Sequence, residues 1–521
     1  MIRPLPLAGL LIACAAAPAA AQLEMLTVPK GALRIELSGT FDPTDNLWLN
    51  GSHVPVGSLL TVPSLDAATT PLAGALDASL ARIFGHAPAG ASLGGISSIV
   101  SQTHGIGGLG LAVGLSRRVT WFLDVPFVYL RTRSALGYDS TRANVGLNPA
   151  DRSLGNSAGQ AQNTNFFAQF DLAIDSLSKR ISSGFYAGDA TMLALAQQTL
   201  ANSPALRSEL FTLLSDSAHA SLVLPTASSA DGTALLGQIT QLESTFSDRL
   251  GIMGFGDAPA LPTAPLGPTA FSQVLGAANG YGLSPLTGLP RWGLGDVTTG
   301  VTMQLLQHQS ASGRVINAWG QATFRLPNAS AADPTVLFDQ ATGPTQPSIT
   351  LSGIGEMATH GIGVRGQLQY EHALPSTAVT RVGAPDDLLI PALFATNIRE
   401  QPGDIMAITA RPYVQVAPHL ALAGLAEYWR QSASQSKYAT ATDSLDGIAA
   451  SVLDMGTAAN ALVLGVGFSY SHDGRNRDGI VTLPVEAGFS IERTVASSAG
   501  IVPAPLTSRV YFRVYESLFK P

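Results

Sequence analysis

Two short segments have the residue spacing of a serine-nucleophile turn. They are residues 90–94 (Gly-Ala-Ser-Leu-Gly) and 155–159 (Gly-Asn-Ser-Ala-Gly). In hydrolases this pattern holds the serine on a sharp turn between a strand and a helix. No convincing strand pattern precedes Ser92 or Ser157, and a chain with 53 glycines produces such spacing by chance. An acyl hydrolase or protease is therefore a minor alternative, and we predict that the protein is not an enzyme.

Metal and cofactor motifs are weak. There is no His-Glu-x-x-His pair and no phosphate-binding loop. The single cysteine, Cys14, lies in a predicted export signal, so the exported chain has no thiol ligand. Asp473, Asn476 and Asp478 offer oxygen ligands for calcium, but such side chains also favour a tight turn. The nine histidines are scattered and are interpreted as turn or loop residues. We predict no metal and no cofactor.

Charged and amide side chains recur at alternate positions of several segments. If these segments are strands, such side chains share one face, and in a barrel that face lines the interior. Both signs of charge occur, which argues against a strongly ion-selective pore and fits either a structural ladder or a weakly selective passage. For Asp296 we expect an ion pair with Arg325 or Arg365 across the interior. The predicted lumen-facing residues are Arg34, Glu36, Asp124, Asp296, Gln304, Gln321, Arg325, Arg365, Gln367, Glu371, Arg411, Glu427, Glu486 and Arg513.

Alternation with period two predicts the strands that carry these residues. Residues 109–115 and 119–131 alternate apolar with small or polar side chains around a Ser-Arg-Arg turn, which predicts a hairpin of long strands. Strands of about 9–11 residues are long enough to cross a bilayer at a tilt. The pattern recurs near residues 33–41, 297–305, 316–325, 347–358, 362–371, 404–416, 419–430, 460–471, 480–492 and 508–519.

Composition indicates a folded chain that is unusually poor in charge for a surface facing water. Charged residues make up 12% of the chain, against roughly 25% in typical soluble domains. The net charge of −7 argues against nucleic-acid binding. Residues 1–21 have the pattern of a secretory signal peptide, and residues 11–14 resemble a lipobox, which leaves lipid attachment to Cys14 open. No apolar run of 18 residues follows the signal, so we expect either a soluble β-sandwich or a β-barrel.

The lengths of the connections favour the barrel. Short connections near 116–118, 307–313, 359–361, 416–419 and 472–479 alternate with long ones. Outer-membrane barrels have short periplasmic turns and long extracellular loops. We therefore predict an antiparallel, up-and-down transmembrane β-barrel of 12 strands. Fourteen strands would require two more within 42–108, where residues 94–103 are the doubtful piece. The predicted divisions are residues 22–132, with the first strands and a long loop, residues 133–290, an extracellular loop, and residues 291–521, with the remaining strands.

The long loop contains a predicted helical insert. Residues 165–252 change to a period of 3.6, which predicts two or three amphipathic helices, with Pro204 interrupting the middle one. Three interpretations stay open: an exposed cap, a gate or plug of the lumen, and a partner-binding element. The residues that would form a gate or plug are Phe167, Phe170, Ile174, Leu177, Leu235, Ile239, Leu242 and Phe246.

The hairpin at 110–128 resembles that of outer-membrane transporters related to the phenol meta-pathway degradation proteins, and more distantly the long-chain fatty-acid and hydrocarbon channels. Gly-Leu-Gly-Asp-Val at 293–297 and Arg-Leu-Pro at 325–327 also resemble that family. The resemblance covers 110–130 and 290–372 well. It implies uptake of hydrophobic small molecules, without naming a substrate. The aromatic residue nearest the C-terminus is Phe519, whereas barrels of this kind usually end on the aromatic that the assembly machinery reads.

The sequence thus predicts a barrel in the outer membrane of a Gram-negative-type bacterium that takes up small hydrophobic molecules passively. Its expected partners are outer-membrane lipid, the barrel-assembly machinery and these solutes. The alternative is a surface scaffold or adhesion barrel whose lumen is filled and which transports nothing.

Overall fold

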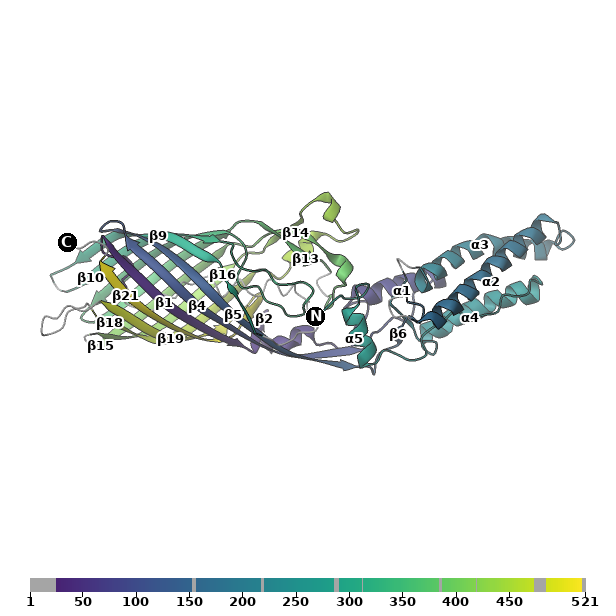
Figure 1. The fold of residues 1–521 in the computed structure, drawn as a ribbon, viewed down its shortest axis with the longest axis horizontal. Coiled ribbons are helices and arrows are strands. Elements are labelled where there is room, and N and C mark those ends of the chain that lie inside the picture. Colours follow the sequence, from purple (N-terminus) through teal and green to yellow (C-terminus); the bar gives the residue numbers. More distant parts are fainter. Residues whose placement is uncertain are drawn as a thin grey trace.

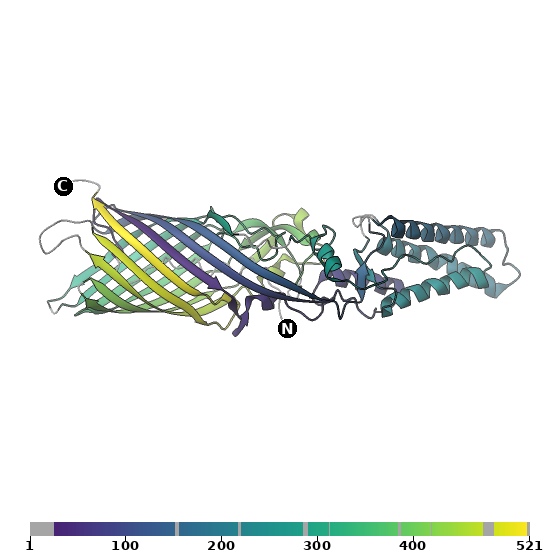
Figure 2. The same cartoon turned by 60° about the horizontal axis from the view of Figure 1, so that its bottom comes forward.

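The structure is a computed structural model that describes residues 25–151, 156–216, 220–284, 290–311, 313–383, 387–417, 419–472 and 484–517. The predicted signal peptide, the lipid-attachment residue Cys14 and the 473–479 turn lie outside these ranges. A β-barrel and an elongated helical lobe lie end to end (Figures 1 and 2). The barrel strands are β1 (Ala32–Thr44), β4 (Gly95–Gly114), β5 (Val119–Asp139), β9 (Val297–Gln309), β10 (Val315–Leu326), β11 (Ser348–Thr359), β12 (Ile362–Ala373), β15 (Ile405–Ala417), β16 (Leu420–Gln431), β18 (Ala459–His472), β19 (Val485–Ala496) and β21 (Leu506–Ser517).

These twelve strands form one closed antiparallel sheet, so the predicted strand number is confirmed. Closure is made by β1, which pairs with β4 on one side and with β21 on the other. The doubtful piece at 94–103 is the outer part of β4, which pairs with β5 over its whole length. The fourteen-strand alternative is therefore wrong. A short extra strand, β8 (Arg291–Leu294), pairs with β5 just beyond the first residues of β9.

The apolar face of the barrel points outward. Leu368, Met406 and Val466 are 63%, 65% and 68% exposed, and they alternate with inward residues that are less exposed, such as Gln369 at 8% and Ile405 at 4%. A soluble sandwich would bury the apolar face instead, so the sandwich alternative is wrong. An outward apolar band with a polar interior is the pattern of membrane barrels. None of the described helices is long and apolar enough to cross a membrane.

The two ends of the barrel differ as predicted. At one end the strands are joined by short turns, such as the two-residue turn of His360 and Gly361, where both residues have positive φ angles. All the long connections leave the other end, where β4 and β5 extend beyond the barrel toward the helical lobe (Figure 2). Small sheets cover this end: β2 (Asn46–Leu49), β3 (Ser52–Pro55) and β20 (Ile501–Pro503), and also β13 (Ser376–Arg381), β14 (Ala395–Gln401) and β17 (Gln435–Tyr438).

The helical lobe contains α2 (Ser157–Ser182), α3 (Ala190–Leu214) and α4 (Ala230–Ser244), which continues into a π-helical turn, Thr245–Arg249. Each helix begins at a side-chain cap, supplied by Asn156, Asp189 and Ser229. The predicted insert is thus helical, but it begins earlier than expected. The prediction that Pro204 interrupts the middle helix is wrong, because α3 runs through it. Beside it the Ser203 hydroxyl donates to the Thr199 carbonyl, 2.7 Å away.

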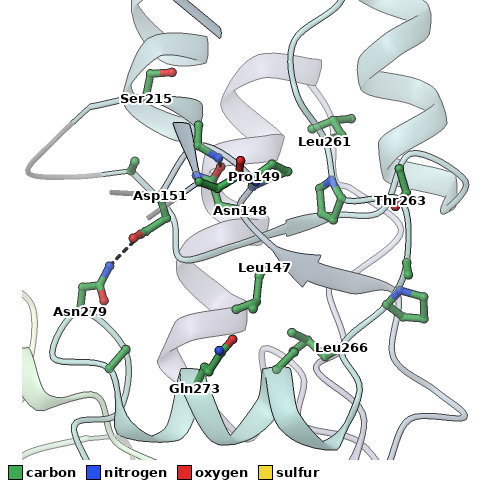
Figure 3. A pocket seen from close by; sticks show the side chains of 18 of the residues that line it. Leu147, Asn148, Pro149, Asp151, Ser215, Leu261, Thr263, Leu266, Gln273 and Asn279 are labelled. Carbon is green, nitrogen blue, oxygen red and sulfur yellow. Dashed lines mark hydrogen bonds between the residues drawn. The ribbon is translucent and has the colours of Figure 1, made fainter. Parts of the chain in front are cut away.

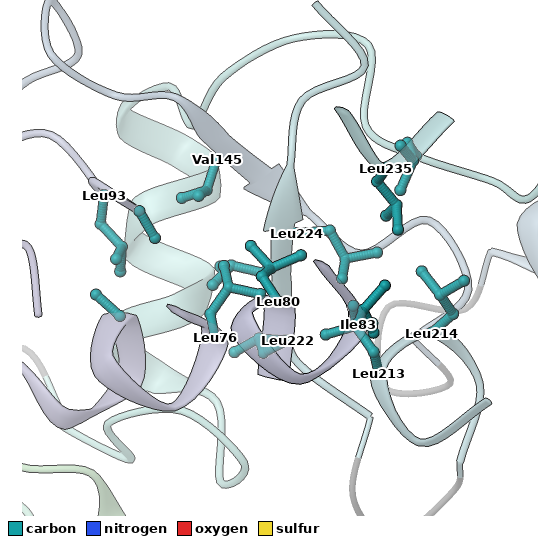
Figure 4. Close-up of a cluster of buried hydrophobic side chains, with 14 of the residues drawn as sticks. Leu76, Leu80, Ile83, Leu93, Val145, Leu213, Leu214, Leu222, Leu224 and Leu235 are labelled. Carbon is teal, nitrogen blue, oxygen red and sulfur yellow. The ribbon is translucent and has the colours of Figure 1, made fainter. Parts of the chain in front are cut away.

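Two further helices join the lobe to the barrel: α1 (Pro71–Phe84) and α5 (Pro268–Gly276), with the small ladder of β6 (Val145–Leu147) and β7 (Val223–Pro225) between them. Their apolar side chains form one continuous buried cluster with those of α2, α3 and α4 (Figure 4). In this cluster Leu80 of α1 lies beside Leu224, and Ile83 of α1 lies beside Leu213. The lobe is therefore packed against α1, α5 and the β6–β7 ladder at the barrel mouth, which we call the root of the lobe.

Candidate functional site: the barrel lumen

The predicted lumen residues, except Asp296, lie on barrel strands at positions that alternate with the outward apolar ones. Arg365, Glu371, Arg411, Glu486 and Arg513 are among the buried charged residues of the chain. Burying a charge is costly unless it is paired. The geometry of the lumen is therefore set by how these side chains pair, and the pairs form separate clusters at different heights.

The cluster nearest the short-turn end centres on Arg513. Strand β21 lies between β1 and β19, and the register places Glu36 and Glu486 on either side of Arg513 in one row. The guanidinium Nε lies 2.6 Å from Glu36 Oε2, and Nη1 lies 3.3 Å from Glu486 Oε2. One arginine thus pairs with two carboxylates from neighbouring strands, and a second arginine, Arg34, lies 4.0 Å from Glu36 Oε2. Asp124 faces the same region from β5, where its carboxylate lies against Gly110.

A second cluster joins β11, β12 and β15. Arg365 Nη2 lies 2.9 Å from Glu356 Oε2, and the Tyr413 hydroxyl donates to Glu356 Oε1 at 2.6 Å. The Arg365 guanidinium also lies over the ring of Trp319, 5.8 Å from its centroid. Glu356, Tyr413 and Trp319 were not predicted as lumen residues. The period-two register of β10, β11 and β15 was the signal that places all three side chains inside.

Nearer the long-loop end, Arg325 pairs with Glu371 and also donates to Ser348 Oγ. Arg509 Nε lies 3.0 Å from Glu492 Oε2 on the opposite wall, and Thr409 donates to Glu427 at 3.1 Å. Gln367 donates to Ser352 and Gln369, while Gln304 and Gln321 share the inner face of β9 and β10.

Asp296 has a different role from the one expected. It lies just before β9, and its carboxylate accepts hydrogen bonds from the backbone amides of Ala329 and Thr345, at 2.8 and 2.9 Å. Arg325 and Arg365 have the glutamate partners described above. Asp296 therefore holds the loop between β10 and β11, and its expected ion pair across the lumen is not made.

The chain before β1 crosses the lumen at the short-turn end, which the sequence did not predict. Val28 is 1% exposed and packs against the inward side chains of Ala112, Phe122 and Tyr515. Its amide donates to Thr120 Oγ1 at 2.7 Å. We call residues 25–31 the inner segment.

Further contacts fasten the inner segment to the wall. The Met25 amide donates to Glu486 at 3.3 Å, and Arg34 donates to the Met25 carbonyl at 2.9 Å. At Gly114 a Cβ atom would stand 2.0 Å from the Pro29 carbonyl oxygen, so only glycine allows this approach. The inner segment thus narrows the lumen beside the Arg513 cluster.

The outer half of the lumen encloses a chamber with a cavity volume of about 80 Å³. Its walls carry apolar side chains, including Trp429, Leu425 and Val463, and charged ones, including Arg411, Glu427, Glu492 and Arg509. Asp42 of β1 also lines it. Sequence reasoning ended the first strand at Phe41 and missed Asp42, although Ser38, Thr40 and Asp42 continue the period of two.

The residues proposed to gate or plug the lumen lie in the helical lobe, away from the barrel (Figure 1). Phe170 and Phe246 are fully buried there, and the Phe170 ring stacks on Phe255 with 4.8 Å between centroids. Phe167, Leu177, Leu235 and Ile239 are buried in the same cluster, and Ile174 and Leu242 pack against it. In this structure the eight side chains hold the helices together and contact no lumen side chain named above.

A larger hollow, of about 1230 Å³, lies at the root of the lobe and outside the lumen (Figure 3). It opens between α5 and the segment after β6. Asp151 accepts a hydrogen bond from Asn279 at its edge, and Pro149, Leu147 and Leu266 line it. Most of its polar groups are engaged in holding the surrounding loops; the Asn148 amide, for example, donates to the carbonyls of Leu214 and Ser221.

Ser92 does not stand on a strand-to-helix turn, because β4 follows it, and residues 152–155, just before Ser157, lie outside the described ranges. The Ser92 hydroxyl is 2.8 Å from that of Ser64, and its amide donates to Asn144. Ser157 is the first residue of α2. Among the described residues no group of three or more histidine, cysteine, aspartate or glutamate side chains is placed to hold a metal ion.

No protein-family model and no curated protein sequence matches the chain. Among solved structures, an outer-membrane channel from Pseudomonas putida F1 is 9% identical, with a TM-score of 0.39 and with 95% of this chain and 99% of that chain covered. The transport unit of the autotransporter AIDA-I from Escherichia coli is 8% identical, with a TM-score of 0.30 and coverage of 96% and 94%. The Pseudomonas putida toluene transporter TodX is 10% identical, with a TM-score of 0.22 and coverage of 94% and 90%. These similarities are too low to assign a function, and the relation to the phenol meta-pathway family stays a prediction.

Proposed function

We propose that the protein is a passive channel of the outer membrane of a Gram-negative-type bacterium, and that small, mainly apolar molecules pass through its lumen. In this proposal the long-loop end faces the exterior and the short-turn end faces the periplasm. The N-terminal 21 residues direct export, and the barrel-assembly machinery inserts the exported chain into the lipid.

The observation that carries the proposal is the interior of the barrel. It holds paired charges and a chamber that mixes apolar and polar walls, which could receive both the apolar and the polar part of a small solute. Opposite charges lie together within the clusters, as with Arg34 and Arg513 beside Glu36 and Glu486. A balanced lining leaves little net field along the lumen, which suits neutral solutes better than ions.

The inner segment narrows this route on the periplasmic side. Its contacts with the wall are few: hydrogen bonds from the amides of Met25, Val28 and Gly31, one from Arg34, and the packing of Val28. A hydrogen bond contributes only about 0.5–1.5 kcal/mol net. The inner segment can therefore leave the lumen while the barrel strands stay paired.

Planar-bilayer conductance tests the proposal. We expect wild-type protein to give small or brief openings, and a variant that lacks residues 25–29 to give larger and longer ones. Retention of the heat-dependent shift on gel electrophoresis would show that the shortened barrel still folds. Vesicles containing the variant should also take up a small apolar solute faster than vesicles containing wild-type protein. If both proteins are silent in both assays, the channel proposal fails.

A second function is favoured by the lobe. A passive channel has no need of a rigid helical lobe on an extended root, and this lobe exposes Phe185 and Met253 by 65% and 80%. The alternative is a surface scaffold whose filled lumen only stabilises the barrel. Two results together would favour the scaffold. The variant that lacks residues 25–29 would show neither conductance nor solute uptake, and wild-type protein would bind cells or matrix while a lobe-deleted variant would not.

A further inference from the structure

The chamber in the outer lumen contains a carboxylate to which no described residue donates a hydrogen bond. Asp42 is 4% exposed, and its Oδ1 has no partner among the described residues. Its other oxygen lies 3.8 Å from His104 Nδ1, beyond hydrogen-bonding distance. A buried acceptor without a partner carries an unrecovered desolvation cost, which a donor brought in by a ligand would recover.

The other carboxylates of the chamber are engaged. Glu492 pairs with Arg509 and accepts a hydrogen bond from Ser490, while Glu427 accepts one from Thr409. Asp42 therefore differs from Glu427 and Glu492, because no described residue donates a hydrogen bond to it. Across the chamber, Trp429, Leu425 and Val463 supply an apolar wall. The chamber thus pairs an apolar surface with an unfilled acceptor in a volume of about 80 Å³.

We propose that Asp42 selects the solutes of this lumen: small neutral molecules with an apolar body and a hydroxyl group that donates to the Asp42 carboxylate. The proposal rests on the proposed channel function and narrows its substrate class. The apolar body replaces water against Trp429, and the hydroxyl gives Asp42 its missing donor. A pure hydrocarbon of the same size fills the apolar side but leaves the carboxylate unpaired.

A pair of isomers isolates the hydroxyl. Butan-1-ol and diethyl ether have the same atoms, but only the alcohol donates a hydrogen bond. Binding to the full-length protein in detergent micelles is followed by tryptophan fluorescence, and the Trp429→Phe spectrum is subtracted to isolate the signal of the chamber. We expect wild-type protein to bind the alcohol at least about tenfold more tightly than the ether, as a hydrogen bond to a charged group predicts.

Two variants assign the preference. Asp42→Leu should reduce the alcohol preference to less than about twofold, because the acceptor is gone. Asp404→Asn makes a similar loss of charge at the outer rim, where Asp404 contacts Tyr370 and His372, and should retain the full preference. If Asp42→Leu loses its heat-dependent gel shift, Asp42→Asn replaces it, and the amide should leave an intermediate preference of about threefold, since a neutral acceptor is the weaker one.

Equal binding of the two isomers to wild-type protein would overturn the proposal, as would an alcohol preference that Asp42→Leu retains. Conductance of the same samples separates this result from the channel proposal. A hydroxyl preference in a protein that never conducts would support the Asp42 site and refute the channel. Conductance without any preference would support the channel and refute the role of Asp42.

Discussion

The lumen of the barrel and the interior of the helical lobe are built from opposite side chains. The lumen buries charged groups, and Glu36, Glu486 and Arg513 stand in one row of hydrogen-bonded pairs. The lobe buries aromatic rings, with Phe166, Phe170 and Phe246 at zero exposure. A single chain therefore contains an inside-polar and an inside-apolar region.

The difference follows from the surroundings of each region. The barrel keeps its apolar side chains for its outer face, where Leu368 and Met406 are exposed as a lipid-facing band requires. The lobe has water around it and must bury its apolar side chains to be stable. The stability of the barrel thus depends on paired charges and a closed sheet, while that of the lobe depends on packing. Substitutions in the two interiors should fail for different reasons.

The largest loss is expected from Arg513→Leu. It removes the shared partner of the buried Glu486 and the partly buried Glu36, at a cost of about 5 kcal/mol, the upper range for a broken buried pair. Urea unfolding in detergent micelles measures the change. Lys179→Ala, which breaks the exposed pair with Asp175 in the lobe, is the control and should cost no more than about 1 kcal/mol. Equal losses would mean that the lumen pairs contribute no more than surface pairs.

Phe170→Ala tests the other interior. Phe170 is fully buried among Phe166, Phe246 and Phe255, and its truncation leaves a cavity that should cost the lobe about 4 kcal/mol. Protease resistance of the lobe should fall while the heat-dependent gel shift of the barrel persists. Leu172→Ala on the same helix changes a side chain that is 66% exposed and should alter neither. Loss of the gel shift in Phe170→Ala would show that the two regions fold as one unit.

How far each region was predictable also differs. Alternation predicted all twelve strands. It also put Arg513 and its two glutamate partners on the inward face, because period two is a local property of the sequence. The inner segment was beyond such reasoning, since Val28 meets Phe122 and Tyr515 only once the barrel has closed. The burial of Phe170 followed from helical periodicity, yet its location outside the lumen did not. The periodicity identifies an apolar face but does not say which partner covers it.

A smaller effect is expected at the junction between the two regions. Tyr281 is fully buried, and its hydroxyl lies 2.7 Å from Thr70 Oγ1 at the start of α1. Tyr281→Phe removes this hydrogen bond without changing the shape of the ring, and should cost about 1 kcal/mol. Hydrogen exchange of α1 should rise, while exchange of α2 and of the barrel strands should not. A rise in all three would mean that the junction transmits stability between the lobe and the barrel.

The smallest effect concerns a carboxylate that water reaches, in contrast to those of the lumen. Asp443 accepts hydrogen bonds from Thr440 and from Asn397, and these donors hold its pKa below the ordinary value of 3.8. A lowered pKa stabilises the folded loop above pH 3.8, and this stabilisation is lost as the pH falls through the lower folded value. Hydrogen exchange of residues 439–444, corrected for the intrinsic rate, should therefore rise only below pH 3.8. In Asp443→Asn the corrected exchange should be the same above and below pH 3.8, because the titrating group is absent. A wild-type rise that begins near neutral pH would assign the change to another group and leave the contrast between exposed and buried carboxylates unsupported.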